Sequence, residues 1–320
     1  MIDQAFTSKD DGLHPPSANF YETETFWFAF FVPERALGAW LYTMVRQTAG
    51  VSGGGLWIWD ASAVDPRQIP FYEKFEWLKV PSDLTADSLT FPNGMAIHRR
   101  DPLMSYDLTY EDRDRISLAL RFDAVETPVP LVTGTPPYPE ASHFDQAGRV
   151  TGHFVLDGER TEVDCHAMRD RSWGPRTERG YRRMGYTWAA DADTSLLAYS
   201  VPREDDDEIY AGYLRRDGEV AHIVSGRRRV RRDPASNLVA AIELEATDVL
   251  GRQVHGTADA SSRMVLTGAT SICVNTALAW VIDGRTVHGE DQDVWPIKQW
   301  RKDAEGRMAG VRPLWSGTAT

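Results

Sequence analysis

The chain has 320 residues, of which 42% are hydrophobic and 18 are proline, so it can form one large globular domain or two of ordinary size. Its 35 basic and 47 acidic residues give a formal net charge of 35 − 47 = −12, which argues against nucleic acid as a partner because an acidic protein repels phosphate backbones. No apolar run approaches the roughly 20 residues that a membrane helix needs, so we expect no stable membrane insertion.

The N-terminal residues and the two cysteines favour a cytoplasmic location. Residues 1–4 lack the basic and apolar segments of a signal peptide. Cys165 and Cys273 have no metal-type spacing and are too few for a disulfide framework. The arginine run at 227–232 is interpreted as a solvated turn between strands. The sequence leaves the oligomeric state open.

Alternating apolar and polar residues predict β-strands through most of the chain. We find no convincing amphipathic helix longer than about three turns, and the glycine run at 52–55 does not precede a helix, which argues against a phosphate loop. Together these patterns predict an all-β protein. The alternating segments are 116–122, 184–188, 238–244 and 272–282, and the expected turns are Ala147-Gly148, Asp157-Gly158, Asp217-Gly218 and Asp283-Gly284.

A faint internal repeat suggests that the chain has two related halves. Residues 99–102 and 231–234 both read Arg-Arg-Asp-Pro ahead of a strand-like segment. We therefore expect two tandem antiparallel β-barrel halves, one over residues 1–173 and the other over residues 174–320. Closing a sheet protects its edge strands, and barrels of about eight strands can hold a small apolar ligand.

The most polar strand face of the chain lies just before the middle. If one strand continues from Glu162, then Glu162, Asp164, His166, Met168 and Asp170 share a face. Such a face either meets solvent or lines the polar part of a pocket. Beside aromatic walls, burial would raise the pKa of a carboxyl group and make it a proton donor. Neighbouring arginines could instead hold the same carboxyl ionised in a structural turn.

Other kinds of catalytic centre find little support. His143 and His153 flank an expected hairpin and could bind a metal with His166, but no pair has ligand spacing, so we expect no metal site. No Gly-x-Ser-x-Gly nucleophile motif is present. Cys165 and His166 are adjacent on a strand and therefore point to opposite faces, which argues against a Cys–His pair.

The segment Asp170-Arg171-Ser172-Trp173-Gly174-Pro175-Arg176 resembles the Asp-x-x-Trp-Gly signature of carotenoid 1,2-hydratase (hydroxyneurosporene synthase)-like proteins. These belong to a wider group of tandem lipocalin-like β proteins, and the layout of the whole chain is similar to theirs. Residues 289–295 also resemble a closing motif of relatives. The resemblance implies two lipocalin-like barrels, a lipophilic ligand, no cofactor, and hydration or cyclisation chemistry.

The resemblance also implies roles for two residues of the signature. Asp170 would be the proton donor, and Trp173 would support the carboxyl or contact a developing cation. The hydratases have histidines around this aspartate, where the present chain has Arg169 and Arg171. Flanking arginines would lower the pKa of the carboxyl and weaken it as an acid.

Two functions follow as hypotheses. In the first, the protein is a cofactor-independent hydratase, dehydratase or cyclase that acts on an isoprenoid- or steroid-like substrate, with Asp170 and His166 as catalytic residues. In the second, it carries a lipophilic small molecule without changing it, and Asp170 is architectural. The fold alone does not decide between them, because such folds host binders and enzymes alike. The residues expected to bind the substrate are aromatic and can stabilise positive charge: Trp59, Trp173, Tyr186 and Trp188.

Overall fold

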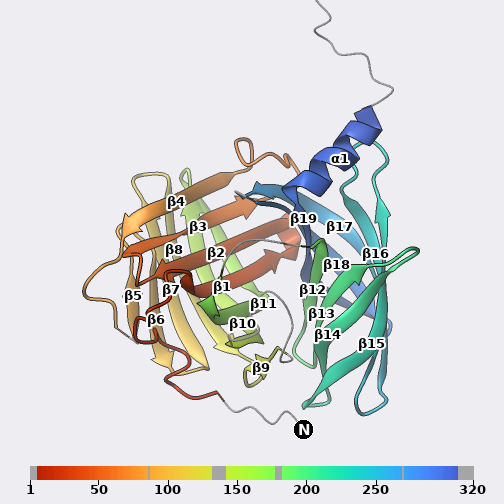
Figure 1. The fold of residues 1–320 in the computed structure, drawn as a ribbon, viewed down its shortest axis with the longest axis horizontal. Helices are drawn as coiled ribbons and strands as arrows, with labels where there is room; N and C mark the ends of the chain where they lie inside the picture. The colour runs from red at the N-terminus through yellow and green to blue at the C-terminus, as the bar shows by residue number, and fades with distance from the viewer. Residues whose placement is uncertain (1–5, 86, 132–141, 177–181, 269, 309–320) are drawn as a thin grey trace, which may run out of the picture.

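The computed structural model describes residues 6–85, 87–131, 142–176, 182–268 and 270–308. The protein consists of two β halves side by side, which confirms the expected all-β tandem architecture (Figure 1). The second half is a closed antiparallel barrel in which β12 to β19 pair in chain order. The first half is a curled sheet with the order β4-β3-β2-β1-β11-β10-β8-β7-β6-β5, to which β9 adds beside β10.

The first half contains two very long central strands, β10 and β11. They form a hairpin that pairs in register from Ser142–Trp173 to Leu156–Glu159. β11 ends at Pro175 and β12 begins at Met184. The domain boundary expected between residues 173 and 174 stays a prediction. The strands are β1 (Glu22–Val32), β2 (Leu37–Arg46), β3 (Val51–Trp59), β4 (Phe71–Lys79), β5 (Ser88–Thr90), β6 (Ala96–Asp101), β7 (Ser105–Asp112), β8 (Ile116–Ala124), β9 (Val129–Pro130), β10 (Ser142–Leu156) and β11 (Glu159–Pro175), with a 3-10 turn at Pro33–Arg35.

The second half ends in an α-helix that lies beside one end of the barrel (Figure 1). Within the described part of the chain, no helix is long and apolar enough to cross a membrane. The elements are β12 (Met184–Ala190), β13 (Thr194–Pro202), β14 (Asp207–Arg216), β15 (Glu219–Arg232), β16 (Val239–Asp248), β17 (Gln253–Thr267), β18 (Ser271–Ile282), β19 (Arg285–Pro296) and α1 (Ile297–Met308).

Three of the four expected turns connect hairpins, and the fourth does not. In the Asp157-Gly158, Asp217-Gly218 and Asp283-Gly284 pairs, both residues have positive φ, as tight hairpins require. Ala147-Gly148 lies within β10 instead. A Cβ on Gly148 would lie 2.3 Å from the Phe122 ring, so this glycine allows a close approach between strands rather than a turn.

Strand β1 is buried on both faces, because it lies between the core of the curled sheet and the barrel. Phe26, Phe28 and Phe30 point into the curled sheet, whereas Trp27 and Ala29 point toward the barrel. The two-residue period of a strand thus supplies one side chain to each apolar cluster in turn. The described residues form three apolar clusters: one in each half, and an interface cluster between the halves.

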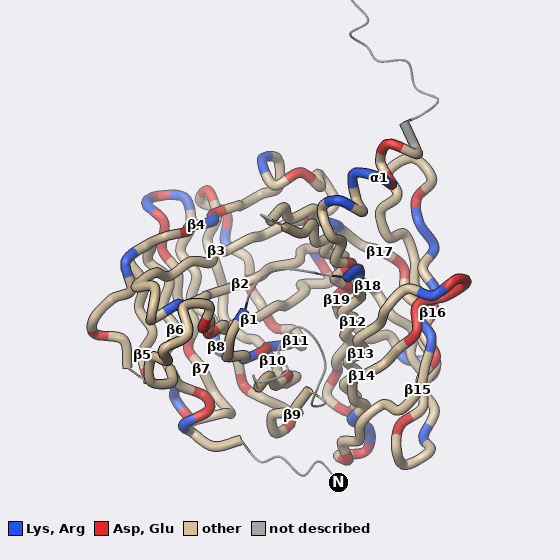
Figure 2. Tube along the Cα trace, in the orientation of Figure 1, with Lys and Arg blue, Asp and Glu red and all other residues tan. Residues whose placement is uncertain are grey.

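The arginine run at 227–232 is not the solvated turn expected from the sequence. It lies within β15, where alternate side chains point into and out of the barrel. Arg228 is buried and forms ion pairs with Asp207 and Asp291. Figure 2 shows the charged residues spread along the strands and loops of both halves.

Candidate functional site

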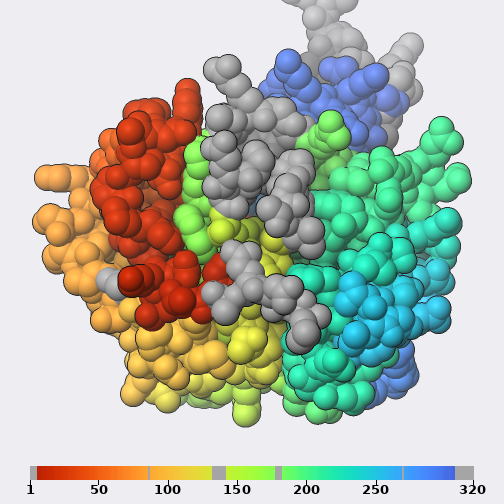
Figure 3. All heavy atoms as spheres, turned by 60° about the horizontal axis from the view of Figure 1, so that its bottom comes forward, coloured from red at the N-terminus to blue at the C-terminus, as the bar shows by residue number. Residues whose placement is uncertain are grey.

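A cluster of titratable side chains lies where the two halves meet. Asp170 lies on β11, and His143 and Asp145 lie on the neighbouring β10, where Asp145 is in register with Asp170. Tyr186 on β12 and Tyr199 on β13 come from the barrel and are in register with each other. Both halves therefore build the site, and the space-filling view shows them pressed against each other (Figure 3).

Asp145 is the centre of the hydrogen bonds in this cluster. The hydroxyl of Tyr186 donates to its Oδ1 and that of Tyr199 donates to its Oδ2, both at 2.9 Å. Nε2 of His143 lies 3.2 Å from Asp145 Oδ1 and 4.0 Å from Asp170 Oδ2. Asp145 is 1% exposed, so these partners take the place of water around its carboxylate.

Asp170 differs from Asp145 because one of its oxygens lacks a partner. Oδ1 of Asp170 is buried and has no hydrogen-bond partner among the described residues. Burial raises the pKa of Asp170 to about 7, against an opposing effect of His143 and with a further increase from Asp145. Near neutral pH the carboxyl group can therefore carry a proton and donate it.

His143 favours its charged, protonated form, whereas Asp170 favours its neutral form. His143 is therefore the cationic partner of the two carboxyls. Burial favours the neutral ring, but Asp145 and then Asp170 outweigh this effect and raise the pKa of His143 to about 9. An imidazolium would thus lie beside Asp170 when that residue gives up its proton.

The expected effect of Arg169 and Arg171 is overridden in the structure. Both point to the other face of β11, where Arg169 pairs with Asp11 at 3.2 Å and Arg171 pairs with Glu24. Their influence on the pKa of Asp170 is smaller than that of burial, because each is already paired with a carboxylate. A histidine, His143, approaches Asp170 from the neighbouring strand β10.

Two of the residues expected in the site do not join Asp170. His166 lies four residues away on the same strand, about 13 Å at roughly 3.3 Å per residue, and burial lowers the pKa of its ring. Trp173 is three residues from Asp170, so it lies on the opposite face, where it stacks on His14 with ring centroids 4.5 Å apart.

The other three expected aromatics belong to the interface cluster. Tyr186 is part of the titratable group itself, and its ring meets Trp27 edge to face at 5.6 Å. Trp188 and Trp59 are 1% and 0% exposed and lie in the same apolar cluster between the halves. Trp27 is in register with Asp170, so an indole neighbours the carboxyl on its own sheet.

Four residues of the site escaped the sequence analysis: Trp27, His143 as a partner of Asp170, Asp145 and Tyr199. The spacing of His143 and Asp145 places both on one face of a strand, which was a usable signal. The expected Asp157-Gly158 turn joins β10 to β11 and fixes the register that places Asp145 opposite Asp170, but the turn expected at Ala147-Gly148 would have interrupted β10 before it reached the site.

The titratable cluster also has the donor set of a possible cation site. One ligand atom each from His143, Asp145 and Asp170 lies within 4.8 Å of the others. The two tyrosine hydroxyls already engage both oxygens of Asp145. A second group with this property, Glu243, Glu245 and His255, lies on the outer surface of the barrel, where Arg229 pairs with both glutamates.

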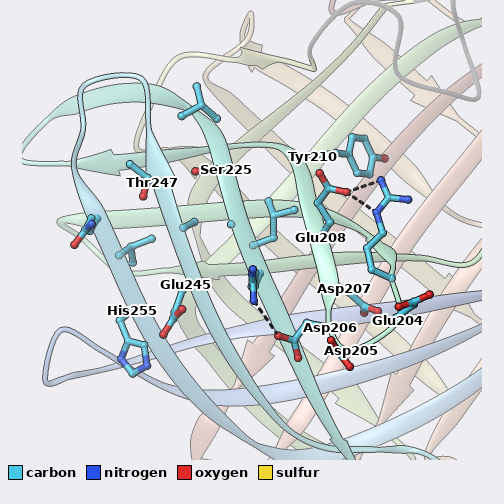
Figure 4. Close-up of a pocket in the computed structure, with 18 of the residues that line it drawn as sticks. Glu204, Asp205, Asp206, Asp207, Glu208, Tyr210, Ser225, Glu245, Thr247 and His255 are labelled. Atoms are coloured by element: carbon cyan, nitrogen blue, oxygen red, sulfur yellow. Dashed lines mark hydrogen bonds and ion pairs between the residues drawn. The ribbon is translucent and has the colours of Figure 1, made fainter.

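The barrel also has a broad, open hollow of about 1410 Å³ over β14 to β17, shown in Figure 4. Its rim contains the acidic run 204–208, of which Glu208 bonds to Arg203. Glu245 and His255 face it from neighbouring strands (Figure 4). Such a charged and solvated surface is a poor environment for an apolar ligand.

A buried glutamate links the two halves close to the site. Glu126 follows β8, and its carboxylate accepts hydrogen bonds from Ser195, from Tyr213 at 2.5 Å and from Arg215 at 3.1 Å. The backbone N–H of Ala147 also donates to it, at 2.8 Å. Donors from both halves thus fix the position of β10 against β13 and β14.

Comparisons with known proteins show the same architecture elsewhere. A protein from Nitrosomonas europaea that is described as a putative AttH has a TM-score of 0.65 at 15% identity, covering 92% of this chain and 98% of that one. Kievitone hydratase from Nectria haematococca has a TM-score of 0.57 at 12% identity, covering 92% and 94%. CghA has a TM-score of 0.55 at 10% identity, covering 86% and 88%. These likenesses establish a shared fold, while kinship with carotenoid 1,2-hydratases in particular stays a prediction.

No curated protein matches the chain by sequence. One family profile does, and it spans residues 7–290, which include every residue of the titratable cluster. The chain therefore belongs to the family described as a domain of unknown function, DUF7064.

Proposed function

We propose that this protein is a cofactor-independent hydratase, dehydratase or cyclase that acts on a lipophilic substrate, with Asp170 as the proton donor. The observation that carries the proposal is the buried, unpartnered Oδ1 of Asp170 at an aromatic interface between the halves. A carboxyl with a pKa of about 7 is suited to general acid catalysis near neutral pH. One neighbour in fold is by name a hydratase, and another has been solved with the small molecule Sch210972, which supports the same class of site.

In hydration, Asp170 transfers its proton to one carbon of an alkene, and a carbocation forms at the other. Trp27 and Tyr186 flank the carboxyl and stabilise the cation through their π faces. Water then adds to the cation, and the proton that it loses returns to the Asp170 carboxylate. The net change is the addition of one water, and the acid is regenerated.

His143 stabilises the intermediate state of this cycle. When Asp170 becomes a carboxylate, the imidazolium 4.0 Å away compensates its charge. Asp145 keeps His143 protonated and is itself held by Tyr186 and Tyr199. Dehydration is the same path in reverse. Cyclisation results when a second alkene of the substrate captures the cation instead of water, and the new cation then loses a proton to the Asp170 carboxylate.

The proposal is tested by incubating the protein with a panel of prenyl and terpenoid alkenes and alcohols in heavy-oxygen water. The organic phase is then analysed by mass spectrometry. Wild type should yield a product that has gained or lost one water, or an isomer, and Asp170→Asn should lower the rate by about 10²- to 10⁴-fold. Asp164→Asn, an exposed aspartate of the same strand, is the matched control.

The carrier hypothesis makes the opposite prediction in the same experiment. A ligand that both wild type and Asp170→Asn bind and release unchanged would show that the interface stores a molecule without transforming it. Turnover by Asp170→Asn at the wild-type rate would likewise rule out Asp170 as the acid.

A further inference from the structure

The interface cluster contains a second polar group, away from Asp170, that consists mainly of hydrogen-bond donors. Glu290 on β19 is 2% exposed, and the indole N–H of Trp40 donates to both of its oxygens, at 2.9 and 2.8 Å. Burial raises the pKa of Glu290 well above its ordinary value, which favours the protonated form with an O–H to donate. The mechanism described above makes no use of it.

Two indoles next to Trp40 have donors without acceptors. The rings of Trp57 and Trp59 lie 6.1 and 6.4 Å from that of Trp40. They are 2% and 0% exposed, and neither Nε1 has a hydrogen-bond partner among the described residues. An unpaired buried donor lowers the stability of the folded protein by about 1–3 kcal/mol. Two such donors close to the Glu290 carboxyl are therefore unusual in a packed interface.

A third unpaired donor lies on the barrel side of the same interface. Asn275 on β18 is in register with Met264 of the interface cluster, and its buried Nδ2 has no partner among the described residues. Its Oδ1 is already occupied, because Cys273 Sγ donates to it at 3.1 Å. The unpaired hydrogen-bonding atoms of this group are therefore donors. A hydrocarbon ligand has no acceptor and could not form hydrogen bonds with any of them.

We infer that the ligand of this interface is an oxygenated lipophilic molecule whose carbonyl or ether oxygen accepts hydrogen bonds from the group formed by Trp57, Trp59, Asn275 and Glu290. The inference deepens the proposed function and rests on it for the location of the ligand. The site excludes pure hydrocarbons by leaving its donors unpaired, and it excludes amines because cations present no acceptor.

The position of this group relative to Asp170 defines how such a substrate would lie. Trp27 is in register with Asp170, and its ring meets Trp40 edge to face at 5.4 Å. Trp40 in turn bonds to Glu290. The two carboxyls are thus separated by a pair of indoles, so a substrate would place its alkene at Asp170 and its oxygen at the far side of these rings.

The experiment measures binding rather than turnover. Geranylacetone is compared with the hydrocarbon of the same skeleton in which CH₂ replaces the carbonyl, by equilibrium partition quantified with mass spectrometry. The full chain with Asp170→Asn serves as the background, so that slow conversion does not disturb the equilibrium. We expect the ketone to bind about tenfold more tightly than the hydrocarbon.

Variants of the donors identify the source of the preference. Trp57→Phe and Trp59→Phe together, or Glu290→Met alone, should reduce the preference to about twofold or less, whereas Glu290→Gln retains a donor and should keep it. Trp77→Phe, at an indole that is 73% exposed, is the control for loss of a tryptophan. Melting curves confirm that each variant is folded.

Equal binding of the two probes, no binding of either, or the same loss for both in the donor variants would overturn the inference. These outcomes are separate from a failure of the proposed function. A carrier that lacks catalysis would still prefer the ketone, and an enzyme that uses Asp170 could still bind both probes equally.

Discussion

Replacing Asp170 by asparagine should change how the stability of the protein depends on pH. The pKa of Asp170 is raised from 3.8 to about 7 in the folded protein, so the folded state binds the proton more tightly than the unfolded chain. The stability that this gives is fully present below about pH 4 and is lost as the pH rises through about 7. With a shift of about 3 units at about 1.4 kcal/mol each, the loss reaches at most about 4 kcal/mol.

The measurement is urea unfolding followed by tryptophan fluorescence at several pH values between about 5 and about 8.5. Wild type should lose free energy of unfolding across this window relative to Asp170→Asn, whose side chain cannot ionise. Asp164→Asn should instead run parallel to wild type, because the pKa of Asp164 is lowered by Arg149 and the residue stays ionised throughout. If the Asp170→Asn and wild-type curves were also parallel, the carboxyl would not be held neutral by burial, and the reasoning would fail.

Three further substitutions test other parts of the account. His143→Gln removes the cation that lowers the pKa of Asp170, so the alkaline limb of the pH–rate profile should move to higher pH. If this limb stayed in place, the two groups would not be coupled. Glu126→Ala removes the carboxylate acceptor of Tyr213 and the counter-ion of Arg215, and should lower the free energy of unfolding by about 3 kcal/mol in denaturant titrations. The exposed Glu159→Ala should have little effect. Gly38→Ala would place a Cβ 2.3 Å from the Trp59 ring. It should lower the free energy of unfolding by about 1–3 kcal/mol and change the near-ultraviolet circular dichroism spectrum. An unchanged spectrum would mean that Trp59 is not packed against Gly38.

The parts of the fold that the sequence predicted are those encoded over short distances. The shared face of residues 162–170 is confirmed, because a two-residue period suffices to establish it. The Asp-Gly pairs formed the expected turns because Asp and Gly tolerate positive φ. Gly148 was misassigned because the packing of Phe122, far away in the sequence, decides its role.

The site was only partly predictable, because most of it depends on pairings between distant residues. The motif resemblance pointed to Asp170, and the Asp157-Gly158 turn sets the register that brings His143 and Asp145 to it, although the turn expected at Ala147-Gly148 obscured this. The docking of the barrel, which supplies Tyr199, has no local signal in the sequence. The effect expected from Arg169 failed because its partner, Asp11, lies far away in the sequence. The same two-residue period that grouped the polar face could have placed Trp173 on the opposite face from Asp170.

Acid catalysis by Asp170 requires that its carboxyl group carry a proton near pH 7. Infrared difference spectroscopy between about pH 5 and about pH 9 detects the C=O band of protonated carboxyl groups directly, and comparing wild type with Asp170→Asn assigns the band. We expect a band that titrates near pH 7 in wild type and is absent from the variant, because burial holds the proton on this side chain. If the two proteins gave the same difference spectrum, Asp170 would not titrate between about pH 5 and about pH 9, which would contradict a pKa near 7.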